Sequence, residues 1–125
     1  MVNLNNLLLE MLKAYDKNQN KDLLSLINSV DNIFINEPQL FDNEIAKINH
    51  IQTIARQRNL SFEEKSFLFQ LINSKDNSEE SKIEKFCACS LLGEHDKAKE
   101  YFEELDSNDK ESLRNYPIMK FYCPE

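Results

Sequence analysis

The sequence contains a single glycine, Gly93, in 125 residues, and no tryptophan. A dinucleotide-binding fingerprint takes two or three glycines in one loop and a phosphate-binding P-loop takes two, so neither motif can be built here. β-Hairpins also depend on glycine for turns with positive φ, which argues against a sandwich or a small barrel. The scarcity of glycine therefore favours an all-α protein in which Asn, Ser and Asp occupy the helix ends and turns.

Cysteine and basic residues are also in short supply. Three cysteines are an odd and low number, which is typical of a chain that keeps reduced thiols. The amino-terminal residues lack a basic n-region, and no apolar run approaches the ~20 residues that span a bilayer, so we expect a cytoplasmic protein. The 15 Lys and Arg residues are outnumbered by 22 Asp and Glu residues, and the net charge is −7. Such a charge disfavours nucleic acid and anionic lipid as partners.

Apolar residues recur at helical spacing along the whole chain. They predict helices at residues 3–16, 21–32, 42–59, 61–72, 77–92, 96–105, 109–115 and 118–122, although residues 30–36 are rich in β-branched side chains and could be extended instead. Ser61 with Glu64, and Asn77 with Glu80, have the spacing of a capping box, and Gly93 is placed to end a helix. Because no long linker separates the helices, we expect one compact domain, residues 1–125, of about six to eight antiparallel helices.

Residues 79–106 resemble a single tetratricopeptide-type helix hairpin. That family places a glycine near the end of the turn between its two helices, an alanine five residues later and a large apolar residue four residues after that. Gly93, Ala98 and Phe102 stand at these spacings. The alanine lets the two helices approach closely, and the aromatic side chain fills the groove between neighbouring hairpins.

The likeness does not extend beyond that hairpin. Lys82 and Phe86 stand where the family has a bulky apolar residue and a small one, Lys110 replaces the closing proline, and no second copy of the spacing occurs. The chain as a whole also resembles helical segments of unknown role in multi-domain bacterial proteins, most of all at residues 52–65 and 116–118. These resemblances imply an accessory interaction module, but a helical bundle unrelated to any repeat family accounts for the same residues.

Histidine and cysteine are the candidates for catalysis or metal binding. His50 and His95 are far apart in sequence, and a zinc site would need both of them together with cysteine or carboxylate ligands. Cys87 and Cys89 point about 200° apart around a helix and cannot chelate one ion together, and Cys123 has no evident activating base. A small helical enzyme or metal-binding domain that uses these residues is the alternative prediction. We expect no catalytic residue, no cofactor and no metal.

Charged residues indicate where a partner would bind. Arg56 and Arg58 lie in the one basic stretch of the chain, and arginine is enriched at protein interfaces. Residues 94–111 contain eight acidic residues and only three lysines. Three of the acidic residues lie on the predicted outer side of their helix: Glu100, Glu103 and Glu104. This acidic side is either a solvated helix face or a docking surface for a basic protein.

The leading prediction is a non-enzymatic protein–protein interaction module: an adaptor, a regulator or an inhibitor of a partner protein. A helix-turn-helix interpretation of residues 42–72 is opposed by Glu63 and Glu64, which would repel DNA from the start of the recognition helix. The aromatic segment at residues 116–122 either packs back on the helices, which we favour, or pairs two copies in a homo-oligomer.

Overall fold

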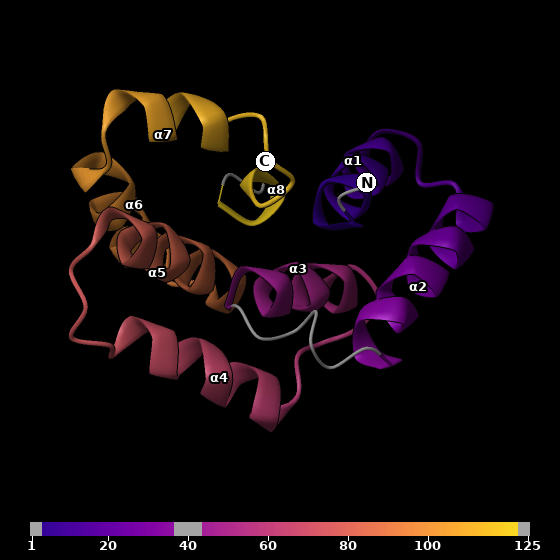
Figure 1. The fold of residues 1–125 in the computed structure, drawn as a ribbon, viewed down its shortest axis with the longest axis horizontal. Coiled ribbons are helices and arrows are strands. Elements are labelled where there is room, and N and C mark those ends of the chain that lie inside the picture. The colour runs from indigo at the N-terminus through magenta and orange to yellow at the C-terminus, as the bar shows by residue number, and fades with distance from the viewer. Residues whose placement is uncertain (1–3, 37–43, 123–125) are drawn as a thin grey trace. The chain divides into compact units, whose positions relative to one another are not determined.

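In the computed structural model, residues 4–36 and 44–122 are described. This part of the chain is helical and contains no strand, which confirms the all-α prediction (Figure 1). Its eight helices are α1 (Leu4–Asn18), α2 (Lys21–Asn36), α3 (Glu44–Ala55), α4 (Phe62–Ile72), α5 (Glu79–Leu92), α6 (His95–Glu104), α7 (Ser107–Leu113) and α8 (Met119–Tyr122). None of these helices is both long enough and apolar enough to cross a membrane.

The chain divides into two compact units, unit 1 at Met1–Arg58 and unit 2 at Asn59–Glu125. Unit 1 contains α1 to α3, and unit 2 contains α4 to α8. The prediction of one domain over residues 1–125 stays a prediction.

Unit 1 is built on a hairpin of α1 and α2. Leu8 and Leu12 of α1 pack with Ile27 of α2, and all three side chains are completely buried. Burying a leucine or isoleucine side chain contributes about 1.5–3 kcal/mol, so this cluster holds the hairpin together. The turn between the helices is closed by Gln19, which has a positive φ of 52°, and by Asn20, whose side-chain oxygen accepts from the backbone N–H of Asp22. α2 continues to Asn36, so residues 30–36 are helical and not extended.

α3 and the turn that follows it are each joined to α2 by a polar pair. The side-chain amides of Asn28 and Gln57 donate to each other at 3.1 and 2.9 Å, and His50 Nδ1 lies 2.7 Å from Asp31 Oδ2. The earlier residue of α2, Asn28, contacts Gln57 in the turn after α3, and the later one, Asp31, contacts His50 within α3, which is the order of an antiparallel helix pair. The contact between α2 and α3 is therefore held by specific hydrogen bonds in addition to apolar packing.

Unit 2 is organised around α5, which contacts α4, α6 and α8. Phe86, Cys87 and Cys89 are all buried, although they point in different directions from the axis. Cys87 lies in the core beside Phe86, and Cys89 is buried as well because α5 has helices on more than one side. Tyr122 of α8 packs its ring against Phe86, with ring centres 4.9 Å apart. The favoured prediction that residues 116–122 pack back on the helices is therefore confirmed.

The helix ends follow local sequence signals, with one exception among the predicted capping boxes. At α4, Ser61 accepts from the N–H of Glu64 while the Glu64 side chain accepts from the N–H of Ser61, which confirms that capping box. At α5 the cap is Ser78, whose hydroxyl accepts from the N–H of Ser81, so the predicted box at Asn77 is wrong by one residue. Gly93 ends α5 with a φ of 79°, the left-handed conformation that only glycine adopts at little cost.

Two other starts differ from prediction. α6 begins at His95, one residue before Asp96, which stands in the first turn; the cap position belongs to Glu94, whose side chain makes no capping hydrogen bond. α7 begins at Ser107, two residues earlier than predicted, because Asp106 caps it by accepting from the N–H of Asp109. In both helices an acidic side chain still lies near the positive end of the helix dipole.

Candidate functional site

The candidate metal ligands named by the sequence are divided between the two units. His50 belongs to unit 1, whereas His95, Cys87 and Cys89 belong to unit 2. Within unit 1, His50 is paired with Asp31; within unit 2, His95 is exposed at the start of α6, and Cys87 and Cys89 are buried in α5. Cys123 lies outside the described residues. Within either unit, none of the described candidates belongs to a group of three possible ligand side chains. The enzyme or metal-binding alternative stays a prediction.

The two described cysteines are also poorly suited to chemistry. Burial raises the pKa of the Cys87 thiol to about 12, with a smaller contribution from the negative charge of Glu84. Burial likewise raises the pKa of the Cys89 thiol to about 11. The thiolate is the form that attacks electrophiles and binds metal, and these surroundings suppress it. Both side chains serve as small apolar residues of the core.

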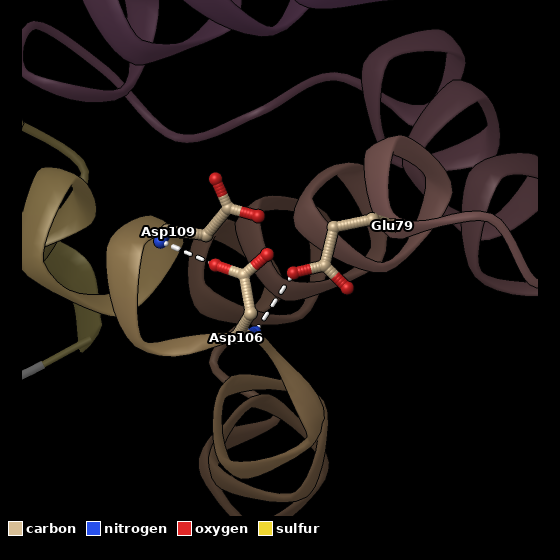
Figure 2. A group of neighbouring side chains, drawn as sticks. All are labelled: Glu79, Asp106 and Asp109. Atoms are coloured by element: carbon tan, nitrogen blue, oxygen red, sulfur yellow. Dashed lines mark hydrogen bonds between the residues drawn. The ribbon is translucent and has the colours of Figure 1, made fainter.

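Three carboxylates from two segments of unit 2 converge at one point (Figure 2). Glu79 is the first residue of α5, Asp106 caps α7, and Asp109 lies in the first turn of α7. One oxygen of each lies within 4.8 Å of the others. Glu79 accepts from the backbone N–H of Asp106 at 2.9 Å, so the cluster links the start of α5 to the turn before α7.

The surroundings of Asp109 raise the pKa of its carboxyl group. The hydrogen bond between the Asp109 and Glu79 carboxyls exists only when one of them carries a proton, and it raises the pKa of Asp109 to about 6, with further contributions from burial and from the charge of Asp106. Oxygen ligands suit hard cations such as Ca²⁺, but exposed acidic groups are common without one. The cluster ties the start of α5 to the turn before α7. No spacing in the sequence marks Glu79 as a neighbour of residues 27 and 30 positions away.

The acidic residues predicted on α6 lie where they were expected. Glu100, Glu103 and Glu104 are exposed, and Ala98 and Phe102 on the opposite side are buried. Glu104 forms an ion pair at 3.8 Å with Lys82 of α5, so part of its charge is neutralised within unit 2.

Asp96 was not part of the predicted acidic site, but it lies on the same side of α6 as Glu100 and Glu103. Asp96, Glu100 and Glu103 are spaced by four and three residues, which places them in one row along the outer side of α6. All three are exposed, and none of them forms an ion pair with a basic residue in the described ranges. We call these three residues the α6 acidic row.

The Arg56 side chain is buried in unit 1. Its guanidinium donates to both carboxylate oxygens of Asp16 on α1, at 2.8 and 2.7 Å, and to the carbonyl of Gln52 at 2.8 Å. Its side chain is 1% exposed. The guanidinium is thus engaged inside unit 1, and the prediction of Arg56 as a partner contact stays a prediction. Arg58 is exposed.

No protein-family model matches the chain, and no curated protein or solved structure matches it either. The hairpin of α5 and α6 is present, but its likeness to the tetratricopeptide family remains a resemblance.

Proposed function

We propose that the chain is a non-enzymatic protein-interaction module that binds a basic segment of a partner protein along α6. The observation that carries this proposal is the α6 acidic row. Three carboxylates stand in line on an exposed helix face, whereas Glu104 beside them is paired with Lys82. Exposed carboxylates spaced in this way favour lysine or arginine side chains presented at the same repeat.

The electrostatics of unit 2 favour the same kind of partner. Residues 61–125 carry 15 acidic and 9 basic residues, a net charge of −6, whereas residues 1–60 carry 7 and 6, a net charge of −1. A field of this sign accelerates the approach of a basic protein and repels nucleic acid. Contacts of this kind set the association rate and the choice of partner more than they set the affinity.

The test is capture of partners from a cell lysate by the full chain, compared with a charge-neutralised variant. Glu100→Gln with Glu103→Gln shortens the acidic row, and Glu10→Gln with Glu44→Gln changes the net charge equally on exposed residues of unit 1. We expect a basic protein to be captured by the wild type and by the unit 1 variant, and to be lost from the α6 variant. Raising the salt concentration from ~0.1 to ~1 M shortens the screening length from about 10 to 3 Å, so the bound protein should be released.

Two results would contradict the proposal. One is equal loss of the captured protein in both variants, which would indicate a dependence on net charge alone. The other is capture that high salt leaves unchanged, because exposed ion pairs are screened under those conditions.

A further inference from the structure

We draw no further inference here: the strongest candidate, the cluster of three carboxylates that Glu79, Asp106 and Asp109 form between the start of α5 and the start of α7, is a group of acidic side chains beside which no second feature of the described residues points to a ligand.

Discussion

Arg56 and Asp16, which are 40 residues apart in sequence, form a two-point ion pair that joins the turn after α3 to α1. The Nε and Nη2 atoms of the guanidinium each donate to a different oxygen of the carboxylate, at 2.8 and 2.7 Å. A paired, parallel arrangement of this kind is the strongest form of an arginine–carboxylate contact. It makes the turn after α3 part of the framework of unit 1.

Replacing Arg56 should therefore weaken unit 1. Arg56→Ala removes both guanidinium donors from the Asp16 carboxylate, and we expect a loss of about 2–3 kcal/mol in the free energy of unfolding, measured by urea titration. Arg56→Lys keeps the charge but cannot make the two-point contact, so it should recover only part of the loss. Lys17→Ala, which removes an exposed cation from the same unit, should change the stability by less than ~0.5 kcal/mol. Equal effects of the Arg56 and Lys17 alanine variants would contradict this role.

The aromatic packing of α8 predicts a second effect on stability. The Tyr122 ring lies 4.9 Å from Phe86 and 5.4 Å from Phe102, measured between ring centres. Tyr122→Ala removes both contacts from a half-buried position, and we expect unit 2 to lose about 2 kcal/mol of unfolding free energy. Tyr122→Phe keeps the ring and should retain most of it. Thermal unfolding followed by circular dichroism distinguishes the two variants.

The buried cysteines predict a difference in reactivity between the folded and unfolded protein. With pKa values of about 12 and 11, Cys87 and Cys89 hold roughly 1,000-fold and 100-fold less thiolate than a thiol at the reference value of 9.0. In a Cys123→Ser variant, we expect almost no reaction with a disulfide reagent at pH 8 until urea is added, after which two thiols should react. Rapid reaction of either thiol in the absence of urea would show that α5 is more open than described.

Local signals in the sequence were sufficient to predict most of the helices. The period of apolar residues marked each helix, and the end of α5 followed from Gly93, because these signals involve residues within one or two turns of each other. The capping box at Ser61 and Glu64 was predictable for the same reason. At α5, two neighbouring polar residues competed for the cap, and spacing alone selected the wrong one, Asn77.

The tertiary pairs could not be predicted in this way. Arg56 was predicted as a partner contact because arginine is enriched at protein interfaces, and nothing in its neighbourhood indicates Asp16 as a partner. Cys89 is buried because α5 is surrounded by several helices, whereas the periodicity argument assumes one buried side. The three converging carboxylates of unit 2 depend in the same way on how α5 and α7 meet. Long-range contacts of this kind leave no local pattern.

The carboxylate cluster predicts a dependence of stability on pH. Asp109 has a pKa of about 6 in the folded protein, against a reference value of 3.8. Between these values the folded chain holds a proton that the unfolded chain releases, so the contribution of Asp109 is most favourable below pH 3.8 and is lost as the pH rises through 6. Asp109→Asn removes this loss. We therefore expect the variant to be more stable than the wild type at pH 7.5, with the difference shrinking towards pH 4.

The measurement is the urea midpoint of unfolding at pH 4, 5.5 and 7.5 for the wild type and for Asp109→Asn. Taking the difference between the two removes the titration of the other carboxyls, including Asp76, whose pKa is lowered by hydrogen bonds from Ser78 and whose contribution therefore has the opposite slope. Glu103→Gln, a matched change on the exposed side of α6, should give a difference from the wild type that varies little with pH. A difference for Asp109→Asn that stays constant from pH 4 to 7.5 would mean that Asp109 and Glu79 do not share a proton.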